Sequence, residues 1–285
     1  MVIQDDGRSL VEALSTLEKG LKKSLAGPGR ARKACEALAN AGALKQLATI
    51  DKHLRPLSDA DLTAYGLEGS RVEVVARLTA RKEQLKAGAR SEILGELTRE
   101  GLEVSLLTEA PLTVLVAPLT VELDLDAAAT KVMYAREVVA ECKADARSII
   151  AARQQAMDHI RERSLDSQVF FDVARHAYAI ALTARGLREG ERVDLVDLLG
   201  PLAMLTLDIG EWRKSPKQGF APYPRYLLAY QLQRLRRDGV LARGGLRLDL
   251  GTATAGSTKN KRDVLFIPTT PTEGQYYLSV RFAPV

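Results

Sequence analysis

Leucines recur every three or four positions near the start of the chain. This is the spacing of a single apolar stripe on an amphipathic helix, so the sequence predicts a helix over 9–25. An AGPG segment at 26–29 is expected to end it, and a second, alanine-rich helix is expected over about 30–53. The stripe consists of Leu10, Leu14, Leu17, Leu21 and Leu25.

A third amphipathic helix is predicted over 71–99. Ser70 and Glu73 stand three residues apart just at its start, which is the pattern of a capping box. The pattern then changes over about 102–125 to alternating positions rich in Val, Leu and Thr. Pro111 and Pro118 favour strand edges or bends there, so we expect two or three short strands that form a β-hairpin.

The helical period returns over 126–163, a stretch without Gly or Pro. Its apolar positions alternate in steps of three and four, as in the seam of a coiled coil. With the 71–99 helix and the strands between them, this stretch predicts a long antiparallel helical arm with a β tip. The alternative is that both helices are core helices of a compact bundle. The seam positions are Val132, Ala135, Val139, Cys142, Ala146, Ile149, Arg153, Ala156 and Ile160.

The last third of the chain changes from helices to strands. A helix is expected over 168–185, a further one over the DLVDLLGPLAMLTL run, and another between Pro224 and Gly239. Strand-like runs follow at 245–250, 263–268 and 276–282. This order is typical of a winged helix, in which one helix and the loop between two strands contact nucleic acid.

Charge is distributed unevenly along the chain. The whole sequence carries 41 Lys and Arg against 36 Asp and Glu, a net charge of +5. Residues 212–262 alone hold twelve basic and two acidic residues, a net charge of +10, which leaves −5 for the rest. A basic block on a mildly acidic body favours a polyanionic partner.

The predicted nucleic-acid site combines the helix that begins after Pro224 with a wing over 251–262. Arginine forms bidentate contacts with phosphate or guanine, and lysine acts as a point charge on the backbone. The alternative is a solvated basic face with no ligand. The candidate binding residues are Arg225, Arg234, Arg236, Arg237, Arg243, Lys259, Lys261 and Arg262, and the helix is expected to bury Leu227, Leu228, Leu232 and Leu235.

Other kinds of site have weaker signals. The segment from Gly251 to Lys259 resembles a phosphate-binding loop, but its lysine does not directly follow the second glycine and a strand comes next. Three carboxylates alternate along one expected strand and are considered as a divalent-cation site or as solvated charges. They are Glu122, Asp124 and Asp126. Tyr223, Tyr226 and Tyr230 share a helical spacing and either pack in the core or stack on bases.

These patterns predict a mainly α chain with small β elements (α+β), divided into a helical region over 1–165 and a basic winged-helix-like domain over 166–285. We expect a non-enzymatic protein without metal or cofactor that binds nucleic acid, with duplex DNA favoured. The long helix is expected to mediate homo-oligomerisation or to bind a protein partner. The alternative function is an adaptor or structural subunit of a protein assembly, whose winged module binds protein.

The same sequence indicates a cytoplasmic protein that does not associate with membranes. Its start is polar and acidic, and no uncharged apolar run approaches the roughly 18 residues of a membrane span. Cys35 and Cys142 are the two cysteines, and their wide separation predicts thiols in a reducing compartment rather than a disulfide framework.

Overall fold

The computed structural model describes residues 2–38, 42–55, 68–208, 210, 213, 222–259, 261–271 and 273–285. The chain separates into two compact units. The first comprises Met1–Glu96 and Asp124–Ala129, and the second comprises Leu97–Leu123 and Thr130–Val285. The helices α1, α2 and most of α4 lie in the first unit, whereas both sheets are built from strands of the second, except for the end residues Asp124 and Ala129 of the first sheet.

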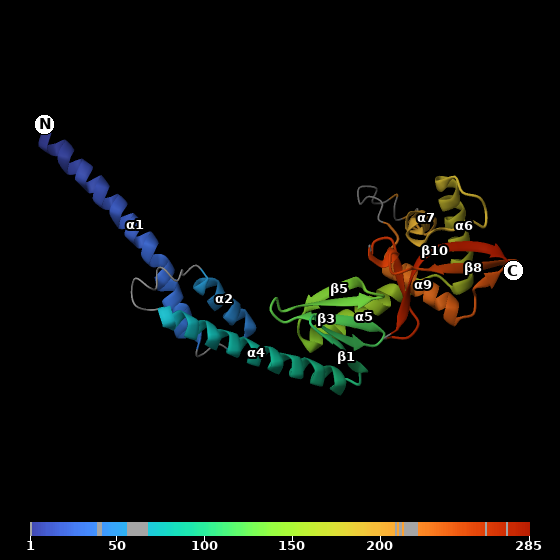
Figure 1. Ribbon diagram of the computed structural model, residues 1–285, viewed down its shortest axis with the longest axis horizontal. Coiled ribbons are helices and arrows are strands. Elements are labelled where there is room, and N and C mark those ends of the chain that lie inside the picture. The colour runs from blue at the N-terminus through green and yellow to red at the C-terminus, as the bar shows by residue number, and fades with distance from the viewer. Residues whose placement is uncertain are drawn as a thin grey trace. The chain divides into compact units, whose positions relative to one another are not determined.

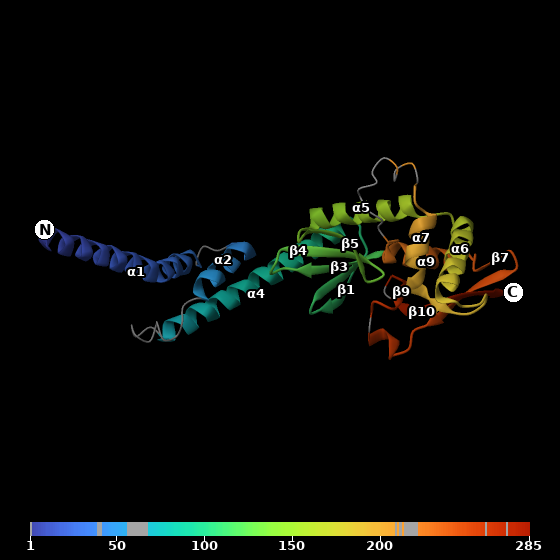
Figure 2. The same ribbon diagram turned by 90° about the horizontal axis from the view of Figure 1, so that it is seen from above.

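In the described part of the first unit, the helices are α1 (Val2–Leu38), α2 (Leu44–Leu54) and α4 (Glu68–Arg99). Contrary to the predicted break at 26–29, α1 continues through Pro28. Proline removes one backbone hydrogen bond from a helix, and the packing immediately beyond it offsets this loss. The buried residues of this small core are Ala31, Ala34, Leu47, Ile50, Leu54 and Leu78. The part of α1 before this core extends away from α2 and α4 (Figures 1 and 2).

The first sheet of the second unit is an antiparallel meander with the order β1-β2-β3-β4-β5. The stretch predicted to hold a hairpin forms three of these strands, and β4 and β5 continue the sheet. The bounds are β1 (Val104–Glu109), β2 (Leu112–Val116), β3 (Leu119–Asp124), β4 (Ala129–Tyr134) and β5 (Glu137–Lys143).

The predicted helix over 126–163 is wrong in its first half. Residues 129–143 form β4 and β5, and only α5 (Ala146–Arg163) is helical. Along β4, Thr130, Val132 and Tyr134 are buried alternately, which is the period of a strand. The β4–β5 turn uses Ala135 and Arg136 at φ values of 52° and 67°, so it lacks the Gly or Asn that normally marks such a turn.

The helix α5 lies along one face of this sheet (Figure 2). Its N-cap residue is Asp145, whose side chain accepts a hydrogen bond from the backbone N–H of Ser148 at 2.8 Å. On the inner side, the guanidinium of Arg153 donates to the backbone oxygen of Ala117, with Nη2 at 2.6 Å. These contacts fix both the start and the middle of α5 against the sheet.

The rest of the second unit contains α6 (Ser167–Arg185), the 3-10 helix η1 (Leu195–Leu198), α7 (Leu199–Leu205) and α9 (Arg225–Arg237). The second sheet has the order β6-β10-β8-β7, and β9 pairs with the first part of β10. Its strands are β6 (Val193–Asp194), β7 (Ala242–Arg243), β8 (Leu246–Thr252), β9 (Leu265–Pro268) and β10 (Gly274–Pro284). The strands β8, β9 and β10 fall where the sequence predicts strands (Figure 1).

One continuous core joins these elements. It includes Leu119 and Val132 of the first sheet, Phe170 of α6, Leu232 of α9 and Phe282 of β10. The predicted fold class is therefore wrong: the chain is mixed α+β with two antiparallel sheets, and β4 and β5 stand where the first half of the second arm helix was predicted. The winged-helix assignment is not confirmed, because the C-terminal helices share their core with the first sheet and α5.

We expect Phe282→Ala to destabilise the second unit. Phe282 is 2% exposed, and its ring centroid lies 5.3 Å from that of Phe171 and 5.2 Å from that of Tyr178. Loss of a buried ring should lower the free energy of unfolding by about 3–5 kcal/mol. Urea denaturation followed by circular dichroism measures this change. Val285→Ala is the control, because Val285 is 82% exposed and should change stability by less than about 0.5 kcal/mol.

The cap at Asp145 predicts a pH-dependent contribution to stability. Hydrogen bonds from Ser148, above all from its backbone, hold the pKa of the Asp145 carboxyl below its usual value. Asp145→Ala should therefore lower the free energy of unfolding by about 1 kcal/mol near neutral pH. This difference is present above pH of about 4 and is lost as pH falls through the lowered pKa. Equal stability of both proteins at pH 7 would contradict the assignment.

Candidate functional site

The structure distributes the predicted nucleic-acid residues over several places. The apolar face of α9 is confirmed, since Leu227, Leu228, Leu232 and Leu235 are all buried. Arg225, Arg234 and Arg237 of α9, and Lys261 and Arg262 of the segment after β8, line two pockets together with residues that were not predicted. We call them the turn pocket and the arginine pocket.

The turn pocket is a cavity of about 360 Å³ next to the β4–β5 turn. Arg136 projects from that turn, with its guanidinium carbon 4.1 Å from the ring centroid of Phe266 and 5.2 Å from that of Tyr276. Its Nη1 also donates to the Tyr276 hydroxyl at 3.0 Å. The pocket is lined by Ala135, Arg136, Glu137, Arg225, Lys261, Arg262, Phe266 and Tyr276.

Arg225 at the start of α9 is committed to internal contacts. Its Nε donates to Glu137 Oε1 at 2.6 Å, and its Nη1 donates to the backbone oxygen of Arg262 at 2.8 Å. Its Nη2 donates to the backbone oxygens of Lys261, at 3.1 Å, and Val264. Arg225 therefore positions the segment that carries Lys261 and Arg262. Both of these residues are exposed.

The arginine pocket is a cavity of about 340 Å³. The hydroxyl of Tyr134 donates to the side-chain oxygen of Gln233, and burial raises the pKa of this hydroxyl, so it stays protonated. The rings of Tyr134 and Tyr230 meet edge to face at 5.7 Å. The lining consists of Pro118, Tyr134, Met157, Arg161, Tyr230, Gln233, Arg234 and Arg237.

The three arginines of this pocket differ in their freedom. Arg234 is 27% exposed and donates to the backbone oxygen of Leu165 at 3.1 Å, and it pairs with Asp238 at 3.4 Å. Arg237 is 68% exposed and contacts Asp238 at 3.1 Å. Arg161 is 60% exposed, with Asp158 at 3.5 Å. Thus Arg161 and Arg237 can turn toward an anion at little cost, whereas Arg234 is held in place.

Both pockets adjoin the same turn and the same helix. Tyr134 lines the arginine pocket, and the next three residues line the turn pocket. Along α9, Arg225 and Arg234 stand nine residues apart, or about 14 Å at 1.5 Å per residue. We call the two pockets together the basic tract.

Other residues of the predicted site lie elsewhere. The guanidinium of Arg236 covers the ring of Tyr277 at 4.5 Å. Arg243 pairs with Asp172 at 3.2 Å and donates to Gln168 at 3.0 Å. The backbone of Lys259 belongs to the 3-10 helix η3 (Ser257–Lys259), and its side chain is outside the described residues. Within the basic block over 212–262, residues 212, 214–221 and 260 also lie outside the described part of the chain.

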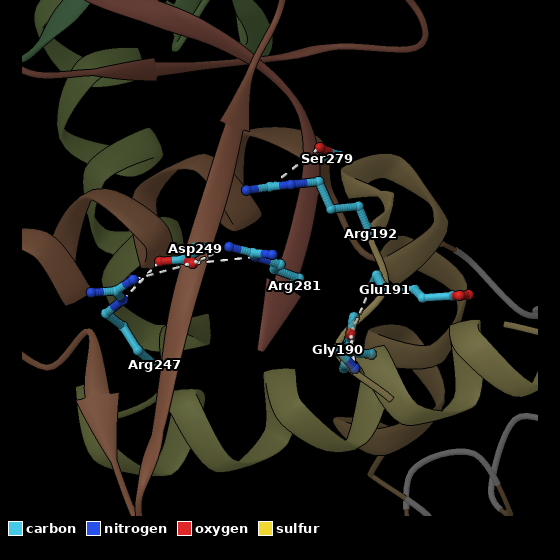
Figure 3. A network of polar contacts seen from close by, with 8 residues as sticks. Gly190, Glu191, Arg192, Arg247, Asp249, Ser279 and Arg281 are labelled. Atoms are coloured by element: carbon cyan, nitrogen blue, oxygen red, sulfur yellow. Dashed lines mark hydrogen bonds and ion pairs between the residues drawn. The ribbon is translucent and has the colours of Figure 1, made fainter. Parts of the chain in front are cut away.

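Arg247 belongs to a separate polar network on the second sheet (Figure 3). Asp249 accepts hydrogen bonds from Arg247 at 2.9 Å and Arg281 at 3.2 Å, and these guanidinium groups, Arg247 first, hold the pKa of its carboxyl below the usual range. A Cβ at Gly251 would collide with Ser279 Oγ and with Arg192 Nη1, so glycine is needed for this close approach. The network neutralises part of the basic block.

The carboxylates considered for a cation have separate partners. Glu122 pairs with Lys131 at 3.0 Å, Asp124 accepts from the backbone of Ala127 at 2.9 Å, and Asp126 pairs with Lys82 and Lys86, each at 2.8 Å. The described residues contain no group of three His, Cys, Asp or Glu side chains that could hold a metal ion. None of the described helices is long and apolar enough to cross a membrane.

The predicted tyrosine stripe is used for packing. Tyr223 is 4% exposed, the ring of Tyr226 lies 6.5 Å from that of His159, and Tyr230 packs on Tyr134. Sequence reasoning missed Arg136 and Arg161. Neither lies near the basic block in the sequence, so only the packing of the β4–β5 turn and of α5 against α9 brings them to the pockets.

Comparison with known proteins adds no relative to this description. No family model matches the chain, and neither a curated protein nor a solved structure matches it. The chemistry of the basic tract therefore rests on its own geometry.

We expect Arg225→Ala to destabilise the second unit by about 2–3 kcal/mol. Arg225 and Glu137 are 23% and 32% exposed, and removal of one partner leaves a partly buried carboxylate and three backbone oxygens without their donor. Arg188→Ala, at an exposed position outside the tract, should change stability by less than about 0.5 kcal/mol. Urea denaturation measures both, and equal values would show that Arg225 has no structural role.

Proposed function

We propose that the second unit binds nucleic acid through the phosphate backbone, with the two pockets of the basic tract as successive contact points. The observation that carries this proposal is the convergence of exposed cations from four segments on one tract: the β4–β5 turn, α5, α9 and the segment after η3. They are Arg136, Arg161, Arg237, Lys261 and Arg262.

The geometry favours backbone contact over reading of bases. One strand of a B-form duplex presents a phosphate about every 3.4 Å, so the roughly 14 Å between Arg225 and Arg234 along α9 corresponds to about four nucleotides. Arg225 and Arg234, which a groove-inserting helix would turn toward bases, instead hold internal oxygens. Backbone contacts determine position and affinity but carry no direct sequence information.

The aromatic rings also favour a duplex ligand. Phe266 and Tyr276 are covered by the guanidinium of Arg136, and Tyr230 packs against Tyr134. Unpaired bases bind by stacking on open aromatic faces, which these contacts occupy. A duplex needs only the cations, and we therefore keep duplex DNA as the proposed ligand.

Salt-dependent titration of a fluorescent DNA duplex tests this function. The variants Arg161→Ala/Arg237→Ala and Lys261→Ala/Arg262→Ala should each weaken binding, and each should reduce the slope of log affinity against log salt by about 2, or about 0.9 for each lost phosphate contact. Arg147→Ala/Arg188→Ala is the matched control, because it removes two exposed charges outside the tract. Binding that is absent at low salt, or equal slopes in all four proteins, would refute the proposal.

A second candidate function is that of an adaptor in a protein assembly. The strand β1 lies at the edge of the first sheet, and Ser105–Glu109 are exposed. Leu106 and Leu107 on this edge are 45% and 38% exposed. An exposed edge can accept a strand from a partner protein. This function would be favoured if the chain forms a stable complex with a protein and does not bind the DNA duplex in the titration above.

A further inference from the structure

The leucine stripe of α1 is exposed to solvent. Leu14, Leu17 and Leu21 are 55%, 61% and 55% exposed, and Leu25 is 67% exposed. They lie on one side of the helix because their spacing is three or four residues. Monomeric proteins seldom expose a continuous apolar row, so a row of this kind marks an interaction surface.

Nothing in the described part of the first unit covers this stripe. The core that α1 shares with α2 and α4 begins at Ala31, beyond Leu25, the last leucine of the stripe. The helix segment that carries the stripe extends away from both helices (Figures 1 and 2). At Gly20, a Cβ would meet no heavy atom within 4 Å, which shows the same open surroundings.

The spacing of the stripe specifies the kind of occupant. From Leu14 to Leu21 the leucines follow a step of three and a step of four, which is the seam of a two-helix coiled coil. Every other copy of the chain in solution presents the same stripe, so a second α1 is a matching occupant that is always available. Pairing of identical faces about a two-fold axis also closes the assembly at a dimer.

The charge along α1 indicates an antiparallel orientation. Residues 2–17 hold three acidic and one basic residue, a net charge of −2. Residues 18–33 hold six basic and one acidic residue, a net charge of +5. A parallel pair would set the two positive halves side by side, whereas an antiparallel pair sets each positive half beside a negative one.

We infer that the chain self-associates through antiparallel pairing of the α1 leucine stripes of two copies. The five leucines recognised in the sequence are centred between positions 17 and 18, so full overlap places Leu14 opposite Leu21 of the second copy. Because the seam is short, we expect it to bury less area than a standard protein interface and the dimer to form in the micromolar range.

Sedimentation velocity of the full chain between about 1 and 200 µM tests this inference. The mass should rise from 31.1 kDa toward twice that value. Leu14→Glu/Leu21→Glu should weaken association at least about tenfold, because it buries charge in the seam. Thr16→Glu/Ala26→Glu is the matched control, since it adds the same charge on the opposite side of α1 and should leave association unchanged.

Disulfide trapping tests the orientation. In a Cys35→Ser/Cys142→Ser background, a mixture of Leu14→Cys and Leu21→Cys chains should form the mixed disulfide faster than either like pair. A wild-type chain that stays at 31.1 kDa, equal association of both glutamate variants, or preferred like-with-like disulfides would overturn the inference. Arg161→Ala/Arg237→Ala should dimerise normally, so failure of the proposed nucleic-acid binding is distinguishable from failure of pairing.

Discussion

The guanidinium of Arg225 is the interaction on which the candidate site depends. It joins the start of α9 to Glu137 of β5 and to the backbone oxygens of Lys261, Arg262 and Val264. A guanidinium suits this role because its five donors have a fixed planar geometry and it remains charged at any relevant pH. The same side chain lines the turn pocket, so its internal contacts also shape that cavity's wall.

The arginines of the basic block differ in whether their guanidinium groups are used inside the protein. They divide into those that hold the fold, as Arg225 and Arg234 do, and those that remain exposed, as Arg237 does. Arg136 and Arg161 come from other parts of the chain and restore positive charge around the two pockets. Net charge predicts that a region attracts polyanions, but contacts within the fold decide which cations can bind them.

Secondary structure was predictable where the pattern was unambiguous. The apolar face of α9 and the last three strands follow from spacing and from the residues that flank them. The strands over 129–143 were not predictable, because Val132, Ala135, Val139 and Cys142 also fit the spacing of a helix. In addition, Ala135 and Arg136 form the turn between the strands without a glycine that would mark it. Burial of Thr130, Val132 and Tyr134 on the second unit's core favours the strand over local helix propensity.

The sequence alone therefore determined the local features: the leucine stripe of α1, the apolar face of α9 and the location of the basic block. The two apolar faces depend on residues a few positions apart, which short-range periodicity reports directly, and the basic block follows from the count of charges along the chain. Only the tertiary structure decided that Arg136 and Arg161 line the same two pockets as Arg237, Lys261 and Arg262. It also decided that the guanidinium of Arg225 is used for contacts within the protein. Arg136 and Arg161 stand at least 76 positions before Arg237 in the sequence, so these residues meet only when the shared core brings the β4–β5 turn, α5 and α9 together.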